Sequence, residues 1–235
     1  FVNGRSLVEI TRADFRERTR RYGFLVTLVL TLYAGVLFLP ARTAGYATVD
    51  MDGWSGVYNA HWVGVTTAMM CALFLSFAGF YVVRGSIDRD RRTGVGAILA
   101  ATPLSRAAYL ASKALSHFLV LAAMTAVLLV AAFAMQMIRG EDTHVNLPVL
   151  VAPFLFVALP VMALTAAVAV FFETIPALSG TLGSVVWFFF WIFVIIDPIG
   201  LERAAHGVRP PFWLDPSGVG IVSWEMVRGA AEVIP

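Results

Sequence analysis

Five long apolar stretches constrain this chain more than any other feature of its sequence. They cover residues 23–40, 61–83, 107–138, 147–172 and 178–199. A helix needs about 20 apolar residues to cross the hydrocarbon core of a bilayer. Backbone polar groups find no water there, so a spanning segment of this kind must satisfy them internally as a helix. The stretches therefore predict an all-α integral membrane protein, a polytopic helical bundle with five visible spans.

The amino-acid composition supports the membrane class. Of the 235 residues, 59% are hydrophobic and 14% are charged, whereas soluble domains carry roughly 45–50% apolar and about 25% charged residues. A soluble fold of this length leaves too much surface exposed to hide so many apolar side chains. The single cysteine, Cys71, lies in an apolar stretch. We expect it to be a buried hydrophobic residue, since a lone cysteine has no intramolecular partner.

The basic residues cluster in two parts of the chain and predict its orientation. Twelve of the 17 lie in segment 1–22 and in the loop 84–113. The connections 41–60 and 139–146 carry one arginine each. Cytoplasmic connections of membrane proteins carry the excess of Lys and Arg. We therefore expect a multi-pass membrane protein with its N-terminus and the loop 84–113 in the cytoplasm.

The expected spans divide the chain into three parts. Residues 1–22 form a cytoplasmic segment, 23–199 form the transmembrane domain with the cytoplasmic loop 84–113, and 200–235 form an extracytoplasmic segment. An odd number of spans leaves the last segment outside without a returning helix. We therefore expect a sixth helix in the complete protein, beyond residue 235.

The N-terminal segment has the pattern of an interfacial amphipathic helix. Leu7, Ile10, Phe15 and Tyr22 recur at approximately helical spacing, and charged residues occupy the other faces. Such a helix lies in the inner leaflet and is attracted to anionic membrane lipids by its cations. The alternative is a solvated positive flank whose only role is to orient the protein. The large and periodic apolar positions favour the interfacial helix.

The loop 84–113 has two unlike halves. Its first half alternates acidic and basic residues over 88–92, and its second half contains a short apolar segment, 95–101, which predicts a helix. Pro103 cannot continue that helix, and Ser105 is placed to cap the next one. This layout suits the docking of a soluble partner. The alternative is an ordinary positive-inside loop, which needs the arginines but not the helices.

These residues resemble the coupling region of the permease subunits of ABC-2 type exporters. That family has a fixed order of elements in this region: a charged stretch, a glycine, a short apolar helix, a Thr/Ser-Pro-Leu/Val-Ser-Arg turn and a lysine that opens the third helix. In this chain the elements are residues 88–92, Gly94, residues 98–101, residues 102–106 and Lys113. The topology of the whole chain is similar, but the resemblance is specific mainly over residues 84–117. It implies ATPase-coupling roles for Asp88, Arg89, Asp90, Arg91, Arg92, Gly94, Ile98, Leu99, Pro103, Leu104, Ser105 and Arg106.

The resemblance also implies a place in the bacterial plasma (inner) membrane, together with partners and a division of labour. Ile98, Leu99 and the flanking charges would dock into cytoplasmic ABC ATPase subunits, which bind ATP and Mg. A second copy or a sister permease would complete a homo- or heterodimer. Two departures weaken the match: the charged stretch has aspartates where the family usually has glutamates, and five spans are visible where six are usual.

The chain itself carries no motif for catalysis. It has no Gly-x-x-x-x-Gly-Lys-Ser/Thr phosphate loop, so ATP hydrolysis is expected from a partner. Its four histidines have no metal-ligand spacing. No cofactor, metal site, nucleic-acid partner or enzymatic activity is therefore expected in this chain. A non-transporting membrane anchor or assembly protein, docking a cytoplasmic partner through the same loop, is the alternative function; an intramembrane hydrolase ranks third.

A few polar and soft side chains at membrane depth are candidates for a substrate pathway. They are His117, Met135, Gln136 and Glu173. For Met135 and Gln136 packing is the alternative, and for Glu173 the alternative is a hydrated residue at a helix end. The spans offer no strongly charged substrate site, which favours an amphipathic or bulky substrate over a small ion.

Overall fold

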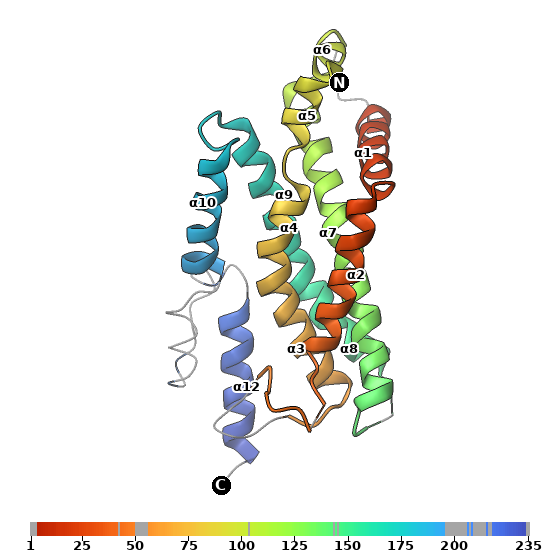
Figure 1. The fold of residues 1–235 in the computed structure, drawn as a ribbon. Coiled ribbons are helices and arrows are strands. Elements are labelled where there is room, and N and C mark those ends of the chain that lie inside the picture. The colour runs from red at the N-terminus through yellow and green to blue at the C-terminus, as the bar shows by residue number, and fades with distance from the viewer. Residues whose placement is uncertain are drawn as a thin grey trace.

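The computed structural model describes residues 4–41, 43–49, 56–102, 104–142, 144, 146–195, 206, 208, 215 and 218–233. All regular elements of these residues are helices (Figure 1). They are α1 (Gly4–Thr19), α2 (Tyr22–Leu37), α3 (Ala60–Met70), α4 (Ser76–Val83), α5 (Ser86–Arg92), α6 (Val95–Ala100), α7 (Arg106–Arg139), α8 (Leu147–Pro153), α9 (Leu159–Thr174), α10 (Thr181–Phe190) and α12 (Val219–Val233). Three π-helical turns, η1 (Cys71–Leu75), η2 (Phe154–Ala158) and η3 (Trp191–Ile195), continue α3, α8 and α10.

Three of the helices are long and apolar enough to cross a membrane. They cover Ala60–Arg92, Arg106–Arg139 and Leu147–Thr174, with 33, 34 and 28 residues. These helices coincide with the second, third and fourth apolar stretches of the sequence. The prediction of an all-helical bundle is confirmed for the described residues, and three of its helices have the length and apolar character of membrane spans.

The first and last apolar stretches give shorter helices. Leu7–Thr19 and Tyr22–Leu37 are bent by 76° and supply a fourth membrane-length element only when counted together. Thr181–Phe193 is apolar but shorter than a full span. Residues 196–199 of the fifth predicted span lie outside the described residues. The described part of the bundle therefore has three helices of membrane length, or four with the bent pair.

Small residues let the long helices approach closely. A Cβ at Gly35 of α2 would lie 2.7 Å from the Cβ of Ala131 in α7. A Cβ at Gly64 of α3 would lie 2.7 Å from the backbone carbonyl oxygen of Leu150 in α8. Close backbone contact of this kind replaces the hydrophobic driving force that is absent between helices in lipid. The glycines thus set the spacing of α2 against α7 and of α3 against α8.

Proline explains one of the π-helical turns. Pro153 and Pro160 lack a backbone N–H, and their positions in the fourth apolar stretch predict kinks or wide turns. The structure has a π-helical turn, Phe154–Ala158, directly after Pro153, and the helix resumes at Leu159. The wide turn is confirmed, and the segment remains a single helix of membrane length.

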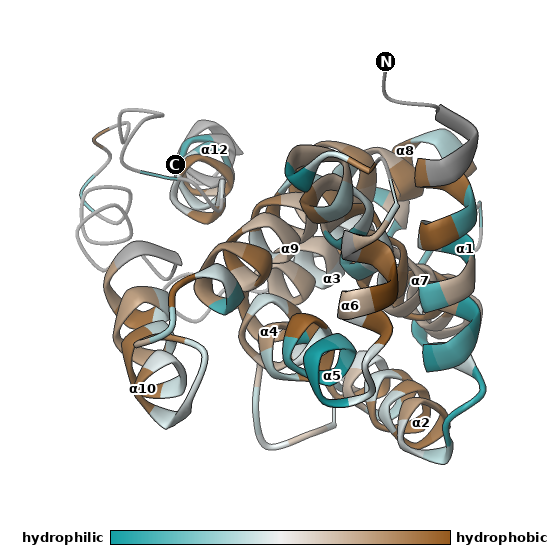
Figure 2. Cartoon of the chain, turned by 90° about the horizontal axis from the view of Figure 1, so that it is seen from above, coloured by the Kyte–Doolittle hydropathy of each residue, from teal (hydrophilic) through white to brown (hydrophobic). Residues whose placement is uncertain are grey.

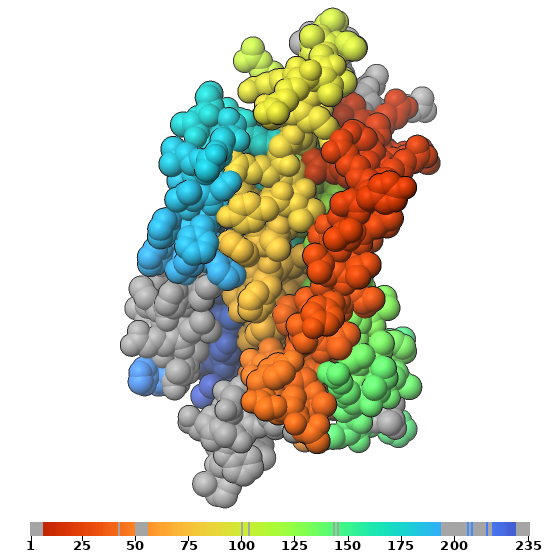
Figure 3. All heavy atoms as spheres, viewed as in Figure 1, coloured from red at the N-terminus to blue at the C-terminus, as the bar shows by residue number. Residues whose placement is uncertain are grey.

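An aromatic cluster attaches α10 to α4. The ring of Trp187 is fully buried and stacks on Phe80 with a centroid distance of 4.3 Å and an interplanar angle of 12°. Farther along, the indole N–H of Trp191 donates to the carbonyl oxygen of Leu73 over 2.8 Å. In Figure 3 the cyan-to-blue spheres of α10 lie against the yellow spheres of α4. The fifth apolar stretch is thereby held against the side of α4 and the π-helical turn that precedes it.

The segment 200–235 contains a helix that the sequence did not predict. Val219, at the start of α12, belongs to the hydrophobic core, and the hydroxyl of Ser223 lies 3.9 Å from the sulfur of Met69 in α3. Figure 1 places α12 near the end of the bundle opposite α6. Most residues between 196 and 217 lie outside the described part of the chain.

Candidate functional site

The loop between α4 and α7 folds into two short helices at one end of the bundle. Gly85 and Gly94 precede α5 and α6 with φ of 89° and 75°, a backbone region that favours glycine. The predicted short helix is confirmed as Val95–Ala100, and the Ser105 side chain accepts a hydrogen bond from the N–H of Ala108, as expected of a cap. Pro103 lies outside the described residues. Seen from this end, hydrophilic residues gather on α5 and along α1 (Figure 2).

The helix α6 stands at the tip of the molecule (Figure 1). Ile98 is 70% exposed, and Val95 is 41% exposed. Leu99 and Leu104 are half-buried. The remaining coupling residues on this outer surface are exposed: Arg91, Arg92, Gly94, Ser105 and Arg106. Ile98 and Val95 thus give α6 an exposed apolar surface at this end of the bundle.

Beneath α6, a network of buried charges joins α1, α5 and α7 around Asp14. The Asp14 carboxylate accepts from Ser116 over 2.6 Å and lies 3.1 Å from the ammonium of Lys113. Two guanidinium groups complete the cluster, Arg89 at 2.5 Å and Arg18 at 3.3 Å. Asp14 is 6% exposed and Lys113 has a side chain 3% exposed. The sequence placed Asp14 on a solvated face of α1, but the structure turns it inward.

Asp90 extends the network along α5. Its carboxylate lies 2.8 Å from the ammonium of Lys113 and accepts from the hydroxyl of Tyr109, also over 2.8 Å. Asp90 is 5% exposed, whereas Asp88 pairs with Arg92 across an exposed face at 2.7 Å. The charged residues assigned to coupling therefore divide into an inner set, with Arg89 and Asp90, and an outer set.

Glu173, at the end of α9, binds the beginning of α5. Its carboxylate accepts from the backbone N–H groups of Gly85 and Ile87 over 2.7 and 2.6 Å, and from the hydroxyl of Ser86 over 3.2 Å. These N–H groups have no partner within α5, and a carboxylate at a helix start is favoured by the helix dipole. Glu173 is 3% exposed, so it is buried rather than hydrated.

His117 lies between these groups and is fully buried. Its Nε2 is 3.0 Å from the hydroxyl of Ser86 and 3.1 Å from the guanidinium of Arg18, which also donates to the carbonyl oxygen of Val83 over 2.8 Å. Although a serine beside a histidine is one element of hydrolase chemistry, neither residue lines the cavity found next to the network. Both side chains are buried, Ser86 with 1% and His117 with 0% of its surface exposed.

The formal charges of the network balance. Asp14, Asp90 and Glu173 face Arg18, Arg89 and Lys113. Burial raises the pKa of the Asp14 carboxyl, but Arg18, Ser116 and Lys113 together lower it well below its ordinary value. Asp14 therefore stays ionised at neutral pH. Removing one member of a balanced buried cluster leaves its partners uncompensated, which is far more costly than the net contribution of the intact pair.

The other candidates for a substrate pathway lie elsewhere. Gln136 follows His117 by 19 positions along α7, which is about 28 Å at the rise of an α-helix. Its side chain is fully buried, and no described residue forms a hydrogen bond with its amide atoms. Met135 is partly buried against the core. The structure thus brings His117 and Glu173 together through Ser86, but not Met135 and Gln136.

Sequence reasoning missed several members of the network as site residues: Asp14, Arg18, Tyr109 and Ser116. A signal was present. Asp14 and Arg18 are four apart on α1, and Ser112, Lys113, Ser116 and His117 form a polar stripe on α7. Residues three and four apart share a helix face, so the stripe on α7 indicates a polar contact on that face but does not identify its partner on α1.

Among the described residues there is no group of three or more histidine, cysteine or carboxylate side chains that could hold a metal ion. The site is therefore defined by buried ion pairs beneath an exposed helix. No protein-family model, curated protein or solved structure matches this chain.

Proposed function

We propose that the chain is the transmembrane permease subunit of an ABC-2-like exporter, driven by a separate cytoplasmic ATPase. In this proposal α6 docks into the ATPase, and the bundle, working with a second permease subunit, moves an amphipathic or bulky substrate out of the cytoplasm. The apolar stretches 23–40 and 178–199 complete five spans, and α1 lies in the inner leaflet. The 76° bend between α1 and α2 and the polar loop at their end of the bundle support this arrangement.

The observation that carries the proposal is an exposed apolar helix on a rigid support. Ile98 projects from α6 with 70% of its surface exposed. The preceding helix α5 is fixed by Asp90 to α7 and by its N-terminal N–H groups to Glu173 of α9. Arg89 adds a connection to Asp14 of α1. A displacement of α6 by a partner would therefore act on three helices of the bundle at once.

The first test replaces the exposed anchor. Ile98→Asp should reduce co-purification with the proposed ATPase partner at least tenfold, since an apolar side chain in the centre of an interface contributes about 2 kcal/mol or more. The unfolding temperature should stay unchanged because Ile98 has few internal contacts. Affinity capture of the ATPase by the tagged full chain, followed by quantitative immunoblotting, measures the effect.

Ile138→Asp is the matched control. Ile138 is 72% exposed but lies at the opposite end of α7 from the loop, so capture of the ATPase should remain at the wild-type level. Equal capture by the Ile98 variant and wild type would refute docking through α6. Substrate-stimulated ATP hydrolysis separates the two functions: a transporter shows it and loses it with Ile98→Asp, whereas a membrane anchor shows none.

The orientation makes a separate prediction. His144 is exposed at the end of the bundle that bears Arg139, and Cys71, the single cysteine, is fully buried. In intact cells, His144→Cys should react with a membrane-impermeant maleimide within minutes, whereas Thr93→Cys should react only after the cells are opened. The reverse pattern would overturn the positive-inside assignment of the loop 84–113.

A further inference from the structure

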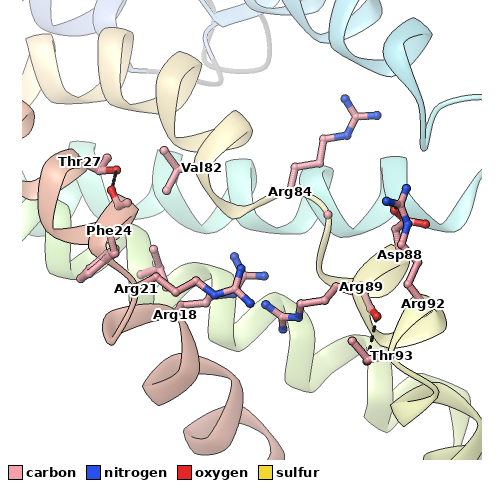
Figure 4. A pocket seen from close by; sticks show the side chains of 13 residues that line it. Arg18, Arg21, Phe24, Thr27, Val82, Arg84, Asp88, Arg89, Arg92 and Thr93 are labelled. Atoms are coloured by element: carbon pink, nitrogen blue, oxygen red, sulfur yellow. Dashed lines mark hydrogen bonds and ion pairs between the residues drawn. The ribbon is translucent and has the colours of Figure 1, made fainter.

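A cavity of about 600 Å³ opens between the α1–α2 corner, the end of α4 and the outer face of α5. Five arginines and one carboxylate line it. Figure 4 shows Arg18 and Arg21 converging with Arg89 from the opposite side, while Arg92 lies beside Asp88 farther along α5. No role in ATPase docking or in the buried network requires an open cavity at this place.

The arginines keep donors for a ligand. Each guanidinium has five N–H donors. The one ion pair described for Arg21 joins its Nη2 to Glu17 at 2.6 Å, and the one described for Arg92 joins its Nη2 to Asp88 at 2.7 Å. The ion pairs described for Arg89 also use Nη2 alone. Several donors on the cavity side are thus not engaged by ion pairs among the described residues.

The cavity also carries a surplus positive charge. With the buried network balanced, the groups that remain are Arg21, Arg84 and Arg92 against Glu17 and Asp88, a surplus of one cation. The guanidinium of Arg84 bonds to neutral oxygens of Ser184, Leu178 and Gly180 and turns toward the α9–α10 connection. A ligand with one negative charge would make the region neutral.

The opposite wall of the cavity is apolar. Phe24 and Thr27 of α2, Val82 of α4 and Val120 of α7 line it below the arginines. The hydroxyl of Thr27 donates a hydrogen bond to the carbonyl oxygen of Gly23 over 2.7 Å, so only its methyl group is left to contact a ligand. These residues belong to helices of the membrane bundle, whereas the arginines lie where the chain bends out of it. The cavity thus has one cationic side, where the chain bends, and one apolar side on the long helices.

We propose that this cavity binds one anionic phospholipid of the inner leaflet, its phosphodiester held by Arg21, Arg89 and Arg92 and an acyl chain lying along α2. Arginine matches phosphate oxygens in a forked geometry. A phosphodiester has the single charge that the surplus requires. The assignment depends on the membrane character of the bundle but not on an exporter function, so it stands or falls separately from ATPase docking.

Titration of the detergent-purified full chain, followed by native mass spectrometry, tests the site. The probes are dioctanoyl phosphatidylglycerol, dioctanoyl phosphatidylcholine with the same chains, and sodium phosphate. We expect one phosphatidylglycerol per chain, bound at least tenfold more tightly than phosphatidylcholine, and weakening with added salt. Equal affinity for the two lipids would overturn the proposal. Phosphate binding as tightly as phosphatidylglycerol would also overturn it, because the apolar wall would then contribute nothing.

A pair of double variants locates the binding. Arg21→Gln with Arg92→Gln should weaken phosphatidylglycerol binding roughly tenfold or more. Both side chains are mostly exposed, so unfolding temperature should change little. Arg20→Gln with Arg91→Gln removes the same charge from the adjacent positions, which do not line the cavity. This control should bind phosphatidylglycerol as tightly as wild type does. Equal losses of affinity in both double variants would mean that the lipid is attracted by positive charge in general, and would refute the site.

Discussion

Replacing Asp14 with alanine should lower the free energy of unfolding by about 3–5 kcal/mol, the usual cost of leaving buried charges without their partner. Asp14 contacts Arg18, Arg89, Lys113 and Ser116 simultaneously. Removing it leaves Lys113, which has a side chain 3% exposed, with Asp90 alone. The change is measured as a shift in the midpoint of unfolding when SDS is titrated into the detergent-solubilised chain.

Glu17→Ala provides the matched control for this prediction. Glu17 is one turn from Asp14 on the same helix, and it pairs with Arg21 at 2.6 Å, but half of its side chain is exposed. Exposed pairs contribute about 0–1 kcal/mol, so the midpoint should barely move. If Asp14→Ala shifted the midpoint no more than Glu17→Ala, the network would not stabilise the bundle, and the rigid support assigned to α5 would be wrong.

The second large effect is expected at the contact between α3 and α8. A leucine at Gly64 should destabilise the bundle by about 3 kcal/mol, the upper part of the range for overpacking. Even a single Cβ at this position would lie 2.7 Å from the carbonyl oxygen of Leu150 and 3.1 Å from its Cα. These are backbone atoms, so no side chain can move aside. The unfolding midpoint and the yield of folded protein both report the loss.

Gly23→Leu tests whether the effect belongs to the contact. Gly23 is also helical, in the first turn of α2, but a Cβ there meets no atom within 4 Å. A leucine at that exposed position should leave the unfolding midpoint unchanged within about 0.5 kcal/mol. Comparable losses at Gly23 and Gly64 would mean that glycine itself, and not the close approach of α3 and α8, determines the result.

The long helices could be predicted from the sequence because hydrocarbon imposes a simple rule on the backbone. The stretches 107–138 and 147–172 differ from the observed helices by two residues or fewer at either end. Local chemistry was equally informative at Ser105, whose hydroxyl has a capping partner three residues later. In both cases the interacting groups are close in sequence, so the local sequence pattern is enough to predict the structure that they form.

The buried network could not be predicted in the same way. Asp14 and Lys113 are 99 positions apart, and nothing near Asp14 in the sequence distinguishes it from Glu17, which faces solvent. The deciding factor is which face of α1 meets α7, a property of the folded bundle. Glu173 was recognisable as a helix-end carboxylate, but its partners are backbone N–H groups of α5 that exist only after Gly85 turns the chain.

The π-helical turn Cys71–Leu75 sets the rotational phase between the two ends of the helix Ala60–Arg92. Gly64, in contact with α8, lies on one side of it, and Arg84, bonded to the α9–α10 connection, lies on the other. The wider turn absorbs one residue more than an α-helical turn does; if the same residues continued as an ordinary α-helix, one half would be rotated against the other by about 100°. Either the glycine contact or the arginine contact would then face away from its partner. The wide turn thus keeps the contact between α3 and α8 in register with the contacts of Arg84 at the other end of the helix.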